Sequence, residues 1–144
     1  MTCSHKVAEV HLPDGTRILA SSCFVRAADE AVPDFGLYAY EGWRPNWPAA
    51  FIEWHDFGLP EDSGKASKLI REAYERARGG QTVEVGCNAG HGRTGTIISC
   101  MAILAGVPPK NAVAWTRRHY CEKAVENTQQ AQWVEEFSKI LPTR

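Results

Sequence analysis

The strongest chemical signal in this sequence is a glycine-rich segment that begins with a cysteine and ends with an arginine. Between Cys87 and Arg93 lie five residues, two of them glycine, and this spacing can wrap the backbone so that successive N–H groups point into one concavity. A helix starting near Arg93 would add its positive N-terminal end, so the concavity suits a phosphate group and needs no metal ion. The predicted anion site consists of Asn88, Ala89, Gly90, His91, Gly92 and Arg93.

Three side chains of this segment have the chemistry for a displacement at phosphorus. Cys87 is expected to be an ionised nucleophile at neutral pH, because a helix N-terminus and a fixed arginine both stabilise a thiolate. The planar fork of Arg93 can bind two phosphoryl oxygens at once. Thr94 can donate its hydroxyl to the sulfur and help it leave in a second step, or it can simply start the helix.

The departing oxygen also needs a proton donor, because an alkoxide is a poor leaving group. Asp56 lies among bulky apolar residues and is followed by Gly58 and Pro60, which suit the hinges of a moving loop. We therefore predict that Asp56 is the general acid. The alternatives are that it is a surface or helix-capping carboxylate, or that Asp62 supplies the proton.

The elements that must position these residues follow from local patterns. Residues 7–24 predict two strands joined at Pro13-Asp14-Gly15, because Asp-Gly supplies the positive backbone angles of a tight turn. Residues 27–48 are dense in glycine, proline and aromatic residues, which favours a compact loop region or a short strand. A helix is expected from Asp62 or Ser63 to Gly79, and a short strand over 81–86.

Beyond the glycine-rich segment the chain is predicted to be helical. One helix opens at that segment and stops at Gly106, and two more are expected around 110–120 and 128–141. The apolar face of the last one comprises Trp133, Val134, Phe137, Ile140 and Leu141. The elements predict an α/β fold, a three-layer α/β/α arrangement in which helices cover both sides of a short, mostly parallel central sheet. Ligands in such folds bind at the carboxyl ends of the strands.

Length and charge restrict the remaining function classes. The 144 residues fit a single domain, 1–144. A net charge of -1 gives no field that would steer the chain onto nucleic acid or a lipid surface. The polar start, Met1 to Lys6, lacks the apolar run of a secretory signal, and no stretch is long enough to span a bilayer. We expect a cytoplasmic protein, monomeric, with no nucleic-acid partner.

The other cysteines and the histidines give no second site. The five cysteines include no C-x-x-C pair, which favours a reducing compartment. Four of them are expected to be small buried hydrophobes or inert thiols, one of which could protect Cys87 by a disulfide under oxidation: Cys3, Cys23, Cys100 and Cys121. No metal-ligand cluster is recognisable among His5, His11, His55 and His119.

The segment from Cys87 to Gly95 resembles the phosphate loop of the protein tyrosine and dual-specificity phosphatase family, commonly C-x-A-G-x-G-R-T-G. The segment from Trp54 to Pro60 is similar to the family's mobile acid loop, usually Trp-Pro-Asp followed by Gly and Pro. Residues 124–130 are similar to the stretch before the last helix, where a glutamine orients the hydrolytic water. Gln130 aligns best with it, and Gln129 and Gln132 are its rivals. The resemblance covers about residues 50 to 137.

Two positions depart from the family pattern. Gly86 stands where a histidine usually precedes the cysteine, which bears on how Cys87 is tuned. His55 stands in place of the proline of the acid loop, which bears on the stiffness of that loop.

The resemblance implies a hydrolase that uses a phosphocysteine intermediate and no cofactor. Its expected partner is a phosphorylated protein or peptide, with phosphotyrosine first and phosphoserine or phosphothreonine also considered, and the aromatics around Trp43 and Trp47 would form the pocket rim. A basic His91 in the loop keeps phosphoinositides and other small phosphomonoesters as alternatives. The other rivals are a phosphate-binding pseudophosphatase, a sulfurtransferase or arsenate reductase, and an RNA 5'-triphosphatase.

Overall fold

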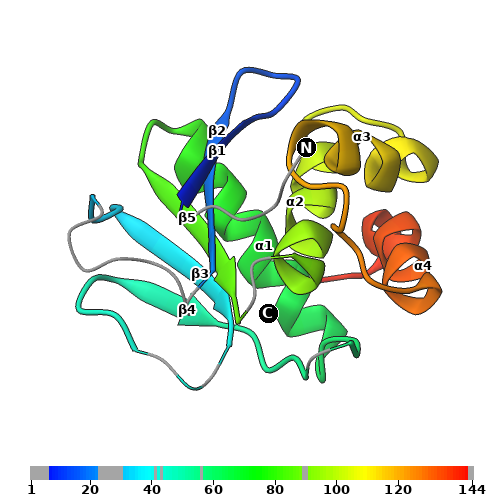
Figure 1. Cartoon of the computed structure of the whole chain (residues 1–144), viewed down its shortest axis with the longest axis horizontal. Coiled ribbons are helices and arrows are strands. Elements are labelled where there is room, and N and C mark those ends of the chain that lie inside the picture. Colours follow the sequence, from blue (N-terminus) through cyan, green and yellow to red (C-terminus); the bar gives the residue numbers. More distant parts are fainter. Residues whose placement is uncertain are drawn as a thin grey trace.

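A computed structural model of the chain describes residues 7–22, 31–40, 42, 44–55, 57–88 and 91–142. Its strands are β1 (Val7–His11), β2 (Arg17–Ser22), β3 (Phe35–Ala39), β4 (Ala49–Phe51) and β5 (Val83–Cys87). Its α-helices are α1 (Ser63–Arg78), α2 (Gly92–Leu104), α3 (Ala112–His119) and α4 (Thr128–Glu136), with single 3-10 turns at Pro109–Asn111 and Phe137–Lys139. The strands form one sheet in the order β1-β2-β5-β3-β4 (Figure 1).

The predicted hairpin opens the fold. β1 pairs antiparallel with β2, and the turn between them contains Gly15 at φ 90°, a left-handed conformation that glycine adopts without strain. The other three strand pairs, β2·β5, β3·β5 and β3·β4, are parallel. The mixed α/β class and the mostly parallel sheet are therefore confirmed.

Strand β5 is the centre of the sheet, and all of its residues are buried. Its last residue, Cys87, lies opposite Ser22 of β2 and Ala39 of β3. Because these three strands are parallel, their carboxyl ends meet at one edge, where a ligand site is expected in such folds.

The helices of the described ranges gather over one face of the sheet. Helices α1 and α2 contact each other and also β3 and β5, while α3 and α4 pack against α2. Figure 1 shows α2, α3 and α4 on one side of the fanned strands. On the opposite face, Tyr38 is buried and its hydroxyl accepts a hydrogen bond from Trp47 Nε1 at 2.9 Å, so within the described ranges a loop segment rather than a helix lies there.

Helix α1 begins and ends where its sequence predicts. Asp62 is the N-cap, and its Oδ1 accepts a hydrogen bond from the Lys65 amide at 3.0 Å. Gly79 caps the other end, and Gly80 follows with φ 106°. Capping therefore occupies the Asp62 carboxylate, the second candidate for the general acid.

Helix α4 is shorter than predicted. It ends at Glu136, and one 3-10 turn follows before the chain becomes extended at Ile140. Trp133, Val134 and Phe137 are buried as expected, but Leu141 is 83% exposed. The prediction for Leu141 was wrong because the helix stops before that residue, so its side chain leaves the apolar face.

The cysteines differ in state. Cys87 and Cys100 are buried and take no part in a disulfide, and burial raises the pKa of the Cys100 thiol well above its ordinary value, which fits an inert core residue. Cys121 is disulfide-bonded. Cys3 and Cys23 lie outside the described residues. The prediction of an inert thiol at position 121 is thus wrong, and the protective disulfide considered for Cys87 is not formed.

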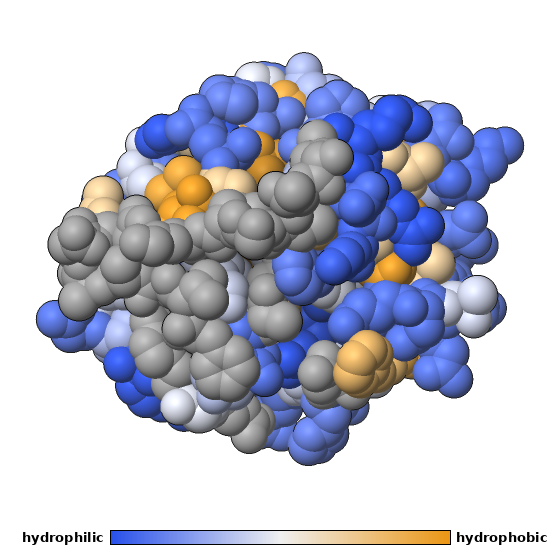
Figure 2. Space-filling view, viewed as in Figure 1, coloured by the Kyte–Doolittle hydropathy of each residue, from blue (hydrophilic) through white to orange (hydrophobic). Residues whose placement is uncertain are grey.

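Hydrophilic residues predominate among those that Figure 2 colours on the visible face, with small separate hydrophobic patches. Within the described ranges, no helix has the length and apolarity to cross a membrane.

Candidate active site

The predicted phosphate loop starts at the carboxyl end of the central strand. Cys87 is 2% exposed, and the Ser22 hydroxyl donates a hydrogen bond of 2.7 Å to the carbonyl of the next residue, Asn88. This bond fixes the backbone where the chain leaves the sheet. Ala89 and Gly90, two of the predicted amide donors, lie outside the described residues.

Arg93 connects two predicted loops. It lies in the first turn of α2, is buried, and donates a hydrogen bond from Nη1 to the Trp54 carbonyl at 2.8 Å. Trp54 begins the acid loop, so the structure brings together the two segments that carry the family resemblance. The first turn of α2 contains no acidic residue, which leaves its positive end uncompensated from within the helix.

Two buried polar side-chain atoms belong to the phosphate loop or to the residue that follows it. Thr94 Oγ1 and Asn88 Oδ1 are buried and have no hydrogen-bond partner within the described ranges. Buried polar side-chain atoms are usually paired, and exceptions often mark functional positions. Asn88 belongs to the segment from Cys87 to Arg93 and Thr94 directly follows it, as expected for a site that binds a polar ligand.

His91 precedes α2 and is half-buried. Its Nδ1 lies 3.5 Å from the sulfur of Cys121, in the loop that follows α3. The ring therefore links the phosphate loop to the neighbourhood of the Cys121 disulfide.

The acid loop is closed by its own contacts. Trp54 pairs with Pro60 across the loop, and the Trp54 indole donates a hydrogen bond of 2.7 Å to the Gly58 carbonyl. His55, which replaces the family's proline, lies 2.8 Å from Glu61 through Nε2 and Oε1 on the exposed side. The predicted general acid, Asp56, follows His55 in the sequence and lies outside the described residues.

The start of α4 is tied to the acid loop. Gln130 is fully buried; its Oε1 accepts from the Glu126 amide at 2.8 Å and its Nε2 donates to the Gly58 carbonyl at 3.0 Å. Asn127 caps α4 and donates from Nδ2 to the Phe57 carbonyl at 2.7 Å. Gln130 thus braces the acid loop from within the protein.

The rivals of Gln130 lie further out. Gln129 and Gln132 are both exposed, and Gln132 donates a hydrogen bond to the Glu136 carboxylate at 3.1 Å along α4. Neither side chain has a described contact with the phosphate loop.

Segment 124–126 packs closely against the first turns of α2. A Cβ on Gly95 would lie 2.8 Å from the Cα of Ala124, and one on Gly92 would lie 1.8 Å from Glu126 Oε1. These glycines therefore have a packing role besides any role in phosphate binding. Sequence patterns alone assigned no role to Glu126.

Arg117 of α3 binds the backbone of this segment, a structural role that the sequence motifs did not predict. Its guanidinium donates to the carbonyls of Ala124 at 2.9 Å and Val125 at 2.8 Å. Val125 has φ 63°, a strained conformation for a buried β-branched residue. Helical periodicity around Arg117 gives no signal for this contact, because its partners lie in a loop.

The space that a side chain would need at position 86, directly before Cys87, is filled by neighbouring residues. A Cβ on Gly86 would lie 2.7 Å from Ser21 Oγ and 3.0 Å from the Tyr38 ring. Both hydroxyls donate to the buried carboxylate of Glu84, from Tyr38 at 2.8 Å and from Ser21 at 3.1 Å. Tyr38 and Ser21 thus fill the space next to Gly86, where the family usually has a histidine side chain.

Tyr120 is a further residue near the nucleophile. It follows α3 and is buried, and burial, with a smaller contribution from the charge of Cys87, raises the pKa of its hydroxyl above the ordinary value. The electrostatic contribution means that Tyr120 and Cys87 lie close enough to interact. No sequence motif pointed to it.

Comparison with known proteins identifies the family. The family model for protein-tyrosine phosphatase matches residues 44–134, which include the acid loop, the phosphate loop and the start of α4. The chain belongs to this family.

Individual relatives match the chain over only part of their length. An uncharacterised protein of Methanocaldococcus jannaschii is 35% identical over 95 residues, which make up 65% of this chain and 57% of the relative; a second one from the same organism is matched over 60% of its length. The chain thus spans less than two thirds of these curated relatives.

Solved structures share the fold. Tk-PTP in its active form has a TM-score of 0.64 at 22% identity, covering 74% of this chain and 79% of Tk-PTP. PTPMT1 in complex with PI(5)P has a TM-score of 0.61 at 16% identity, covering 85% and 90%. At these identities, the similarity establishes the fold.

Proposed function

We propose that this chain hydrolyses phosphotyrosine, and also phosphoserine or phosphothreonine, in phosphorylated proteins through a phosphocysteine intermediate on Cys87. The observation that carries the proposal is a buried cysteine, not disulfide-bonded, at the end of β5, followed within one loop by Arg93. Arg93 in turn contacts the acid loop through the Trp54 carbonyl. Family membership supports phosphatase activity.

In the first step the Cys87 thiolate attacks phosphorus. A new S–P bond forms, and the bond from phosphorus to the substrate oxygen breaks with its electron pair on that oxygen. Asp56 donates the proton that neutralises the leaving oxygen. Arg93 and the loop amides stabilise the negative charge on the equatorial phosphoryl oxygens.

In the second step water attacks the phosphocysteine. The water oxygen forms a bond to phosphorus, the P–S bond breaks, and its electron pair returns to Cys87 as thiolate. Thr94 stabilises the departing sulfur by donating its hydroxyl. The sequence predicts the ionised Asp56 as acceptor of the water proton, and Gln130 as the residue that orients the water.

The test is phosphate release from p-nitrophenyl phosphate and from phosphotyrosine, phosphoserine and phosphothreonine peptides. We expect wild-type turnover and its complete loss in Cys87→Ser, with tungstate still protecting the variant against thermal unfolding. Turnover by Cys87→Ser, or no phosphate release by the wild type, would falsify the proposal. The loss of tungstate binding together with activity would instead point to a folding defect.

A phosphoinositide is the second candidate substrate. PTPMT1, whose fold this chain shares, was solved with PI(5)P, and the half-buried His91 is a basic group within the phosphate loop of this chain. The comparison to make is kcat/KM for phosphopeptides against soluble phosphoinositides. A preference for the lipid headgroups that His91→Ala removes would favour this candidate.

A further inference from the structure

We infer that Glu126 is a second acid–base group of the active site and accepts the proton of the water that hydrolyses the phosphocysteine. The inference rests on the proposed function, and it divides between two carboxylates the two proton transfers that the sequence assigned to Asp56 alone. Asp56 protonates the leaving group, and Glu126 acts in the second step.

The contact with Gly92 places the Glu126 carboxylate at the phosphate loop. An added Cβ on Gly92 would lie 1.8 Å from Oε1, 2.1 Å from Cδ and 2.3 Å from Cγ of Glu126. Gly92 is the first residue of α2 and the last residue before Arg93. The side chain of Glu126 thus lies directly against the backbone that surrounds the predicted phosphate.

The direction of the chain brings Glu126 to the open end of α2. Ala124 packs on Gly95, and Glu126 packs on Gly92, about one helical turn nearer the N-terminus. The segment 124–126 therefore runs toward the loop and reaches it at Glu126. Glu126 is exposed as a residue, so this edge of the loop borders solvent.

The neighbouring contacts place Glu126 between the two loops of the site. The next residue, Asn127, donates to the Phe57 carbonyl of the acid loop at 2.7 Å. Gln130 accepts from the Glu126 amide and donates to the Gly58 carbonyl. Glu126 thus contacts the phosphate loop at Gly92, and its neighbours Asn127 and Gln130 contact the acid loop, which places its carboxylate at the edge of the site where we infer that the attacking water enters.

The backbone that carries Glu126 is held firmly in place. Arg117 binds the carbonyls of the two preceding residues, and Gln130 binds the Glu126 amide. Val125 stays at φ 63° within this framework, a conformation that is unfavourable for a β-branched residue and persists only when the surroundings impose it. Strain of this kind concentrates at functional sites, and here it lies immediately before the proposed acid–base residue.

The chemistry favours a role toward water over a role toward phosphate. A carboxylate repels a phosphate dianion but accepts a hydrogen bond from water, and it becomes a proton acceptor as the water attacks phosphorus. One O–H bond of the water breaks and its proton passes to Glu126. The oxygen binds phosphorus, and the P–S electron pair returns to Cys87.

The decisive variant is Glu126→Gln, which keeps the shape of an exposed side chain and removes the proton acceptor. Mixed rapidly with p-nitrophenyl phosphate, it should release one equivalent of nitrophenol at the wild-type rate and then turn over about 10²-fold more slowly. Acid-quenched samples should contain phosphorylated Cys87. Asp56→Asn should instead slow the first release. The matched control is Glu122→Gln, an exposed carboxylate in the same loop, which should behave as wild type.

Three outcomes overturn the inference, and a fourth overturns the proposed function instead. Wild-type turnover in Glu126→Gln overturns the inference, and so does a parallel fall of burst and steady-state rates, since that marks a structural role. Slow decay of the phosphoenzyme in Asp56→Asn but not in Glu126→Gln also overturns it. If the wild type itself forms no Cys87-dependent intermediate, the proposed function fails instead.

Discussion

The two ends of the central sheet use their polar groups differently. At the end where β1 turns into β2, Asp14 accepts hydrogen bonds from the Tyr74 hydroxyl and, at 3.0 Å, from the Thr16 amide. At the opposite end, where β5 delivers Cys87, the buried Thr94 Oγ1 and Asn88 Oδ1 have no partner within the described ranges. The first end joins the hairpin to α1, and the second retains polar groups that a ligand can bind.

This difference separates stability from function along the same strands. Hydrogen bonds between protein groups contribute to the free energy of unfolding, whereas buried polar groups kept for a ligand lower it until the ligand binds. Changes at the Cys87 end should therefore affect turnover most, and changes at the hairpin end should affect unfolding alone. The following variants, measured for both properties, test that separation.

Arg93→Lys should give the largest effect. Lysine keeps the charge but cannot present two parallel donors to the phosphoryl oxygens or reproduce the bond to the Trp54 carbonyl. We expect kcat to fall by about 10³-fold. Steady-state kinetics with p-nitrophenyl phosphate measures this fall, and activity within a few-fold of wild type would remove Arg93 from the mechanism.

Gly95→Ala should reduce both turnover and the free energy of unfolding. Alanine favours a helix by about 1 kcal/mol over glycine, but its Cβ would lie 2.8 Å from the Ala124 Cα and 3.1 Å from the Val125 amide nitrogen. Because these are backbone atoms, the clash should outweigh the helix propensity and destabilise the protein by about 1–3 kcal/mol. Urea unfolding measures the change in the free energy of unfolding. A variant more stable than wild type would show that segment 124–126 moves to accommodate the added Cβ at little cost.

Tyr74→Phe should lower stability and leave kcat unchanged. It removes a hydrogen bond to a carboxylate, worth about 1.5 kcal/mol. Burial and the Asp14 hydrogen bond raise the pKa of Tyr74 to about 12. The contribution of this hydrogen bond to the free energy of unfolding is therefore complete below about pH 10, the ordinary tyrosine pKa. It is lost as the pH rises through 12. The difference in unfolding midpoint between wild type and variant should narrow over that range.

The stability that the Tyr74–Asp14 hydrogen bond contributes should also fall at low pH. Partial burial alone would raise the pKa of Asp14, but the hydrogen bonds from Tyr74 and Thr16 outweigh it and lower the pKa. Its contribution is therefore present above the ordinary aspartate pKa and is lost as the pH falls through the lowered value. If the difference in unfolding midpoint between wild type and Tyr74→Phe stayed constant from pH 7 to below the ordinary aspartate pKa, this pH dependence would be contradicted.

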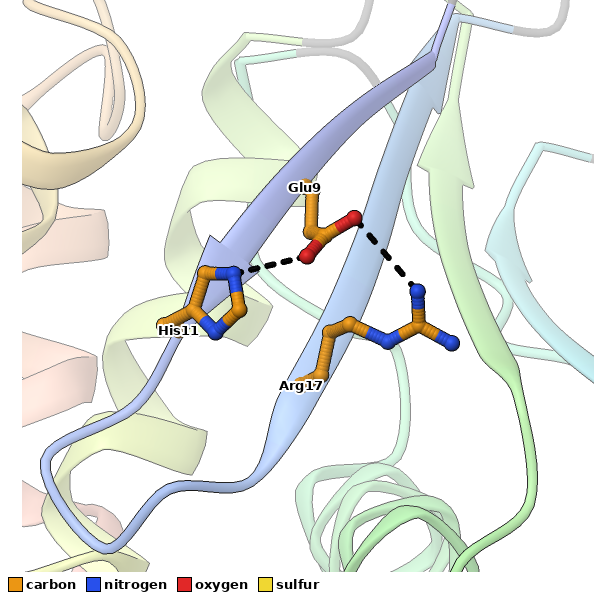
Figure 3. A network of polar contacts seen from close by, with 3 residues as sticks. All are labelled: Glu9, His11 and Arg17. Atoms are coloured by element: carbon orange, nitrogen blue, oxygen red, sulfur yellow. Dashed lines mark hydrogen bonds and ion pairs between the residues drawn. The ribbon is translucent and has the colours of Figure 1, made fainter.

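Glu9→Gln should have the smallest effect. Figure 3 shows Glu9 between His11 and Arg17 on the hairpin, at 2.7 Å and 3.4 Å. All three side chains are about half exposed or more, and such surface pairs contribute about 0–1 kcal/mol. Thermal unfolding should change by no more than the midpoint error at moderate salt, and a loss as large as that of Tyr74→Phe would contradict this ranking.

Local signals in the chain were enough for much of this fold and site. Asp-Gly predicts the hairpin turn through the backbone freedom of Gly15, and Asp62 with Gly79 predicts the ends of α1 through its unpaired backbone groups. The order Cys87, glycines, Arg93 predicts a loop between strand and helix. Each of these features depends on residues that are close together in the sequence.

Contacts between distant segments fixed the rest. The short strand β4 exists because it pairs with β3, Gly86 is a glycine because Tyr38 packs on it, and Glu126 reaches the phosphate loop because Arg117 and Gln130 hold its backbone. The disulfide of Cys121 likewise needs a partner remote in the chain. No window of neighbouring residues contains such pairs, because packing that brings them together forms only when the whole chain is folded.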